Sequence, residues 1–211
     1  MHARLYGLKN YSILTSQVLV PPAMQTILEE EDSKINGLLG AGHVCSVMGL
    51  SAYEIICQEY NIAIVVTGFE VVDLLQGILM LIQQLEHKEA RLENKYSRVV
   101  PYEGNPIAQQ IIEQVFEVCD KEWRGIGILP NSGWQLKDEM AQYDASRKFD
   151  IPERQNQLET ECIAGEVLKG VKKPTDCPHF GQKCTPLHPI GAPMVSSEGA
   201  CAAYFHFSNL S

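Results

Sequence analysis

The chain has 211 residues, 45% of them apolar and 20% charged, which is ordinary for a globular protein. Its net charge of −9 is offset by no basic block and argues against a nucleic-acid backbone as partner. Residues 61–67 and 71–82 are too short or too interrupted to cross a bilayer, and the N-terminus lacks a signal-peptide pattern. We therefore expect a cytoplasmic protein with no membrane partner. Thiols stay reduced there, so seven cysteines indicate metal binding or redox chemistry rather than disulfides.

The first part of the chain alternates short apolar runs with helical stretches. Residues 61–67 are continuously apolar, as is typical of a strand buried on both faces. Residues 11–20 are rich in β-branched and aromatic types, and two prolines end that run. The predicted elements are a strand at 11–20, a helix at 23–31, an apolar piece at 35–39, a helix at 43–60, a strand at 61–67 and a helix at 71–91.

The second part continues this alternation as far as residue 133. Asn105 is a suitable helix cap, and Pro106 suits the first helical position. The predicted elements are a strand at 96–102, a helix at 105–119, a strand at 126–129 and a turn at 131–133. Strands that alternate with long helices indicate an α/β fold, with flanking helices on a mostly parallel sheet.

The character of the chain changes near Asp150. Beyond it Pro and Gly become frequent, apolar runs disappear, and four of the seven cysteines occur. Such a segment buries too little apolar surface to order itself, and a bound metal would supply the missing stabilisation. We therefore expect an α/β lobe at residues 1–149 and a small, loop-rich C-terminal iron–sulfur unit at residues 150–211.

The four late cysteines are Cys162, Cys177, Cys184 and Cys201, separated by 14, 6 and 16 residues. The absence of C-x-x-C pairs weakens a zinc-finger interpretation, whereas iron–sulfur clusters take four thiolates at more variable spacings. Tight Pro and Gly turns follow two of them, and small residues flank Cys201. The spacing favours a cysteine-held metal site, with an iron–sulfur cluster ahead of zinc. Four independent cysteines in a loop-rich domain are the alternative.

A second candidate group follows the predicted strands. His43 stands where an apolar piece gives way to a helix, and Glu70 follows the strand at 61–67. Ligands of open α/β sheets collect at the carboxyl ends of strands, where His43 would act as a donor or metal ligand. Glu70 would orient His43 or accept a proton. A helix cap and a solvated helix-start carboxylate are the simpler interpretations of these two residues.

The remaining candidates have structural explanations of equal or greater weight. Cys57 and Cys119 are assigned to the core, because free cysteine is among the most commonly buried residues. His179 and His188 stand beside late cysteines as alternative ligands, although surface loop positions explain them as well. The run Trp123-Arg124-Gly125 would clamp an anion or fix a domain contact.

Several strings, from about Asn10 to Phe205, resemble the HypD family in the same order. The final string is the most specific of them. They are Val20-Pro21-Pro22-Ala23-Met24, Gly42-His43-Val44, Met48-Gly49, Gly68-Phe69-Glu70, Asp73-Leu74-Leu75, Trp123 to Gly127, Gly165 to Gly170, Cys177-Pro178-His179-Phe180-Gly181, Cys184-Thr185-Pro186 and Met194 to Tyr204.

The resemblance implies a maturation factor for NiFe hydrogenases, with α/β lobes and a small 4Fe–4S unit. It implies a scaffold that assembles the Fe(CN)2CO centre with a HypC-type small chaperone and a HypE-type cyanide donor. In this role the iron of the nascent centre is bound transiently, and the protein is an assembly scaffold with a redox role rather than a turnover enzyme. The family's cluster ligands map onto Cys162, Cys177, Cys184 and Cys201, and its inter-lobe cleft maps around His43 and Glu70.

Two departures from the family pattern affect this expectation. Family members begin with a further lobe whose cysteines are proposed to hold the iron, and this chain starts after that region. The family also commonly has cysteines where Ala164 and Pro193 stand, and that pair would suit a dithiol beside the cluster. We therefore expect a HypD-like chain without the first lobe. The alternatives are a stand-alone iron–sulfur electron-transfer protein and an inactive truncated fragment.

Overall fold

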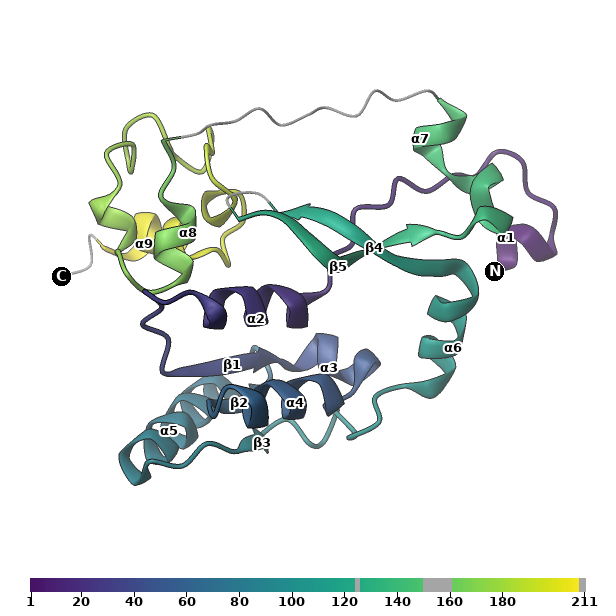
Figure 1. The fold of residues 1–211 in the computed structure, drawn as a ribbon. Helices are drawn as coiled ribbons and strands as arrows, with labels where there is room; N and C mark the ends of the chain where they lie inside the picture. Colours follow the sequence, from purple (N-terminus) through teal and green to yellow (C-terminus); the bar gives the residue numbers. More distant parts are fainter. Residues whose placement is uncertain (124–125, 150–160, 209–211) are drawn as a thin grey trace. The chain divides into compact units, whose positions relative to one another are not determined.

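The structure is a computed structural model that describes residues 1–123, 126–149 and 161–208 (Figure 1). The chain divides into two compact units. The first unit holds Met1–Gln17, Ile35–Val118 and Trp134–Ile151, and the second holds Val18–Lys34, Cys119–Gly133 and Pro152–Ser211. The predicted boundary between residues 149 and 150 adjoins Asp150, which lies outside the described residues, and it stays a prediction.

The first unit is built on a three-stranded parallel sheet, as the alternation of strands and helices predicts. The strands are β1 (Gly37–Ala41), β2 (Ala63–Thr67) and β3 (Leu92–Asn94), in the order β1-β2-β3. Every residue of the central strand β2 is buried, which explains its unbroken apolar sequence. The predicted α/β fold with a parallel sheet is confirmed.

Helices cover both faces of this sheet. Helix α5 (Val71–His87) packs against β1 and β2, while α3 (Gly42–Met48) and α4 (Ser51–Glu59) connect β1 to β2. Gly37 of β1 faces a side chain of α5, whereas Gly40 faces Tyr53 of α4. These two glycines are three positions apart, and strand side chains alternate between faces, so α4 and α5 lie on opposite faces.

The helix predicted at 43–60 is two helices. Gly49 ends α3 with a positive φ of 80° and donates its amide hydrogen to the carbonyl oxygen of Cys45 at 2.8 Å. A Cβ at this position would also lie 2.7 Å from the Tyr102 carbonyl oxygen. Both the conformation and the close approach require glycine here, so the chain turns before α4 begins.

The predicted strand at 96–102 is wrong, because the third strand lies earlier, at Leu92–Asn94. Helix α5 stops at His87 rather than residue 91, since Lys88 adopts a left-handed conformation with φ 56°. Asn94 then redirects the chain. Its side chain accepts from the Tyr96 amide at 3.0 Å and donates to the Val100 carbonyl oxygen at 2.9 Å, which makes residues 95–99 a turn.

The strand predicted at 11–20 is also wrong, because this segment makes only isolated bridges, at Ile13 and Val18. Helix α2 (Val20–Glu29) overlaps the predicted helix at 23–31 but starts three residues earlier, with proline in its first turn. Helix α6 (Pro106–Val115) confirms the predicted cap, since Asn105 accepts from the Ala108 amide at 3.1 Å. The helix ends at Val115 instead of residue 119.

The chain then enters a two-stranded sheet of β4 (Phe116–Trp123) and β5 (Gly127–Leu136). The strand predicted at 126–129 is therefore longer than expected, and the turn predicted at 131–133 lies within β5. No helix in the three described ranges is long and apolar enough to cross a membrane. The remaining elements are α1 (His2–Leu5), η1 (Asp138–Tyr143), α7 (Ala145–Lys148), α8 (Ala164–Leu168), η2 (Pro174–Asp176), η3 (Ala192–Met194) and α9 (Ala200–Phe207).

Candidate functional site: a group of four cysteines

The four late cysteines all belong to the second unit. Cys162 lies two residues before α8 begins, and Cys177 ends the short helix η2. Cys184 closes a tight turn, in which its amide donates to the His179 carbonyl oxygen at 2.9 Å. Cys201 lies in the first turn of α9. Cys177, Cys184 and Cys201 thus lie in or beside short hydrogen-bonded turns and helices.

These four side chains share one neighbourhood. Burial, and then the charges of Cys162, Cys184 and Cys177, raise the pKa of the Cys201 thiol to about 11. Three other thiols are therefore close enough to influence Cys201 electrostatically. All seven cysteines of the chain are present as thiols. A metal that binds this group would have to displace the thiol protons.

Cys184 is anchored in a small core. It is 6% exposed and packs with Met194 and Ala202, with Cys201 and Phe205 at the edge of the cluster. The Ile190 amide points at its sulfur, with the nitrogen 3.4 Å from Sγ. Amide donors of this kind favour the thiolate form and are typical of iron–sulfur ligands.

Glycines allow the loops around the group to approach closely. A Cβ on Gly191 would overlap the Cys162 sulfur, and it would lie 3.7 Å from both Ala164 Cβ and Pro193 Cδ. The positions where the family resemblance implies a dithiol, Ala164 and Pro193, therefore stand beside the same glycine and beside Cys162. This arrangement of thiols, small residues and amide donors fits an iron–sulfur cluster.

The four cysteine side chains do not converge on the position of a single metal ion. In the parts of the chain that the structure describes, no three His, Cys, Asp or Glu side chains are arranged to hold a metal ion. A four-iron cluster holds its thiolates further apart than one ion does, because the cluster itself occupies the space between them. His179, one of the two predicted alternative ligands, is paired with Glu161 at 2.6 Å between Nε2 and Oε2.

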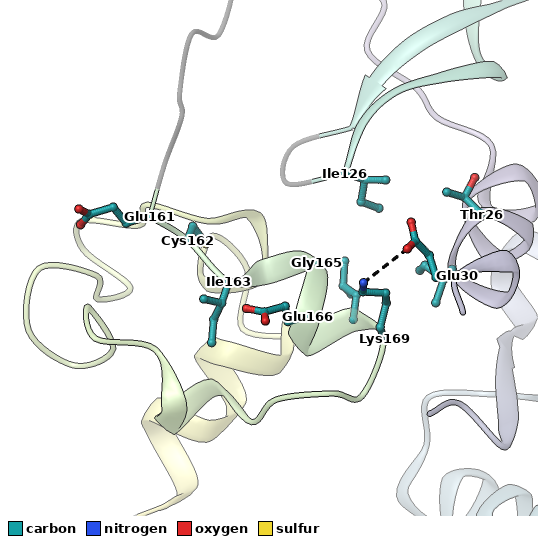
Figure 2. Close-up of a pocket in the computed structure, with 11 residues that line it drawn as sticks. Thr26, Glu30, Ile126, Glu161, Cys162, Ile163, Gly165, Glu166 and Lys169 are labelled. Atoms are coloured by element: carbon teal, nitrogen blue, oxygen red, sulfur yellow. Dashed lines mark ion pairs between the residues drawn. The ribbon is translucent and has the colours of Figure 1, made fainter. Parts of the chain in front are cut away.

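A cavity of about 470 Å³ opens beside Cys162 (Figure 2). Helix α2 contributes Thr26 and Ile27 to its wall, and the segment that leads into α8 contributes Cys162 and Ile163. Its charged residues form ion pairs, since Lys169 lies 3.6 Å from Glu30 and 2.8 Å from Asp32, and Glu166 lies 3.0 Å from Lys172. Of the four cysteines in the group, Cys162 is the one that lines this cavity.

The other predicted site residues lie in the first unit, at the carboxyl ends of the parallel strands. His43 follows β1 and is exposed, and its ring centroid is 4.9 Å from that of Phe69, which follows β2. Glu70 lies beside them but pairs with Arg98, at 3.7 Å, rather than with His43 in any interaction described. The prediction that strand ends bring these segments together is met, and the roles of His43 and Glu70 stay predictions.

Sequence reasoning missed the strongest ion pair at this edge. Arg98 donates to both carboxylate oxygens of Asp73, at 3.0 and 2.5 Å, and stacks 4.5 Å above the Tyr96 ring centroid. These hydrogen bonds hold the pKa of Asp73 below its ordinary value of 3.8. The available signal was the polar run from Lys95 to Arg98, which indicates a loop rather than a strand.

The other predictions outside the cysteine group fared unevenly. Cys57 is buried at 3% exposure, as predicted, whereas Cys119 is partly exposed on β4 and is not a core residue. Trp123 donates from Nε1 to the Ser132 hydroxyl at 2.9 Å, which fixes the indole. Arg124 and Gly125, the rest of the predicted anion clamp, lie outside the described residues.

The fold and the site define an α/β protein with an attached thiol-bearing unit. The family described as HypD: Hydrogenase formation hypA family matches residues 1–208, and the chain belongs to this family. It is 44% identical to the hydrogenase maturation factor HypD2 of Bradyrhizobium diazoefficiens, over 95% of this chain and 54% of that protein. It is 41% identical to the hydrogenase expression/formation protein HupD of Azotobacter chroococcum, over 97% of this chain and 56% of the relative.

A third relative is the hydrogenase maturation factor HypD of Escherichia coli. It is 41% identical over 97% of this chain and 55% of its own length. The chain thus spans about half the length of the curated relatives that it matches.

Proposed function

We propose that this chain takes part in hydrogenase maturation as an assembly scaffold in the cytoplasm, and that its four late cysteines hold a 4Fe–4S cluster. The observation that carries the proposal is the packing of Cys184 with Cys201 in one small core, with Cys162 against Gly191 in the same unit. The charges of Cys162, Cys184 and Cys177 also act on the Cys201 thiol. The family match supports the maturation role. When bound, such a cluster supplies one-electron redox chemistry.

The residues of the chain would have separate tasks. The turn that ends at Cys184 and the first turn of α9 at Cys201 position two thiolates, and the Ile190 amide stabilises one of them. The small core of Met194 and Ala202 keeps water away from the sulfur of Cys184. The cavity beside Cys162 provides the access from solvent through which iron and sulfide, or a reductant, would reach the group.

The strand-end residues of the first unit are proposed to face the cargo iron, the nascent Fe(CN)2CO group. His43 is exposed at the start of α3, and Glu70 is an exposed carboxylate at the start of α5. A HypC-type chaperone would carry this iron, and a HypE-type partner would donate the cyanide. The chain acts here as a scaffold, so binding and orientation are the properties to measure.

The cluster is tested by anaerobic reconstitution with ferrous iron and sulfide. We expect roughly four irons per chain and a visible absorbance from sulfide-to-iron charge transfer. Cys177→Ser and Cys201→Ser should each lose most of both signals, because each removes a thiolate. Cys119→Ser is the matched control, since Cys119 is partly exposed on β4 outside the group. One zinc per chain, with no sulfide-linked absorbance, would overturn the cluster assignment.

The scaffold role is tested by retention of a HypC-type chaperone. The tagged, reconstituted chain should retain the chaperone on a column, and His43→Ala should weaken retention by about tenfold, the effect of one important interface side chain. His87→Ala is the control, because His87 is exposed at the far end of α5. A chain that carries a cluster but retains no chaperone would be an electron-transfer protein instead.

A further inference from the structure

The outer face of helix α5 is unusually apolar for a surface. Seven large apolar side chains on this one helix are between 40% and 72% exposed. Folded monomers rarely expose contiguous apolar patches of this extent, and those that do commonly use them for binding. The seven residues, which we call the α5 stripe, are Val71, Val72, Leu75, Ile78, Leu79, Ile82 and Leu85.

The spacing of these residues places them on one side of the helix. Positions 71, 75, 78, 82 and 85 follow each other at intervals of three and four, so they form a continuous stripe about 21 Å long. The opposite side of α5, which faces the sheet, buries Asp73, Gly77 and Gln84. A surface helix normally turns its apolar side inward, whereas α5 also carries large apolar side chains on its outer side. The stripe is therefore a contact surface whose partner is outside the described structure.

The charge around the stripe argues against a membrane as that partner. Helices that lie on lipid surfaces carry Lys and Arg on their polar side. Residues 71–87 contain neither, and His87 is the one basic side chain in the last turn. The whole chain has a net charge of −9, which an anionic bilayer would repel. The stripe therefore suits an apolar protein surface.

We infer that the α5 stripe is the docking surface for the portion of the HypD-family polypeptide that this chain does not span. The relatives align with 95–97% of this chain, and thus with α5, but the match accounts for only 54–56% of their own length. Nearly half of each relative is therefore available to cover the stripe within the same polypeptide. We expect that portion of the protein to pack aliphatic side chains against the stripe. This inference rests on family membership and not on the cysteine group.

Cysteine labelling measures whether the stripe is covered. Leu79→Cys reports on the centre of the stripe, Ile82→Cys repeats the measurement one turn further, and Glu59→Cys is an exposed control at the end of α4. Each is made in this chain and at the aligned position of the full-length Bradyrhizobium HypD2. Reaction with iodoacetamide is followed peptide by peptide by mass spectrometry, so that the native thiols do not interfere.

In this chain we expect both stripe positions to react within about twofold of the control, because they are exposed. In the full-length relative they should react at least about tenfold more slowly than the control, because burial protects them. Equal rates in the relative would show that the rest of the family polypeptide leaves the stripe open. Slow labelling in this chain would also overturn the inference. If the slowly labelled protein has the mass of a dimer in solution, a second copy covers the stripe. If it has the mass of a monomer, another segment of the chain covers it.

Discussion

Asp73 is a nearly buried carboxylate in the first turn of α5, and Arg98 is the group that holds it ionised. Asp73 is 6% exposed and receives both guanidinium hydrogen bonds, while Arg98 also stacks on Tyr96. The hydroxyl of Thr67 donates to the Asp73 carbonyl oxygen at 2.9 Å, so backbone and side chain are both fixed at the end of β2. This network sets the conformation of the segment that carries Phe69 and Glu70.

Replacing Arg98 by glutamine should therefore destabilise the first unit in a pH-dependent way. Folding lowers the pKa of Asp73, so its contribution is present above its ordinary value of 3.8 and is lost as pH falls through the lower folded value. At pH 7 we expect Arg98→Gln to lower the melting temperature by roughly a few degrees. Melting curves between pH 7 and pH 3 should show this difference shrinking towards the acid end.

Arg91→Gln is the matched control for this measurement. Arg91 is 59% exposed and pairs with Glu89 at 2.7 Å and Glu93 at 3.1 Å on the surface, where ion pairs contribute little. It should change the melting temperature hardly at all. A loss in Arg98→Gln that stays constant across the pH range would mean that stacking on Tyr96, and not the ion pair, provides the stability.

At the scale of elements, the sequence predicted the strongly patterned segments and missed those set by single residues. Strand β2 and the start of α6 follow from local chemistry: an unbroken apolar run, and an asparagine cap before a proline. The break between α3 and α4 could not be predicted in the same way. It depends on the close approach of the Tyr102 carbonyl oxygen to Gly49, and residues 49 and 102 are distant in the sequence.

The residues of the candidate site were likewise predicted where a local pattern marks them and missed where the folded context decides. The four cysteines were visible as a set because a segment poor in apolar residues needs another source of order. His43 and Glu70 were visible because βα junctions meet at one edge of a parallel sheet. Arg98 was missed because its segment was assigned to a strand, whereas the side chain of Asn94 bends the backbone into a turn. Such side-chain control of the backbone depends on the folded context.

At the scale of the whole molecule, the two units differ in how they are stabilised. The first has a sheet whose central strand β2 is fully buried. The described core of the second around the cysteines is small, with Cys184, Met194 and Ala202 as its buried residues. A structural metal couples directly to folding when the apolar core is this small. Removal of iron from the proposed cluster should therefore loosen the second unit and leave the first unit folded.

Amide hydrogen exchange of the reconstituted chain, before and after anaerobic iron chelation, measures this difference. Peptides from α8 and α9 should lose protection by at least about tenfold on chelation, while β2 peptides keep theirs, because the two cores open independently. Cys201→Ser should show the chelated pattern without a chelator, and Cys119→Ser should behave like the parent chain. Parallel loss in β2 would mean that the two units fold as one. Unchanged protection in α9 would mean that its packing on Met194 and Phe180, and not a metal, orders the cysteine-bearing unit.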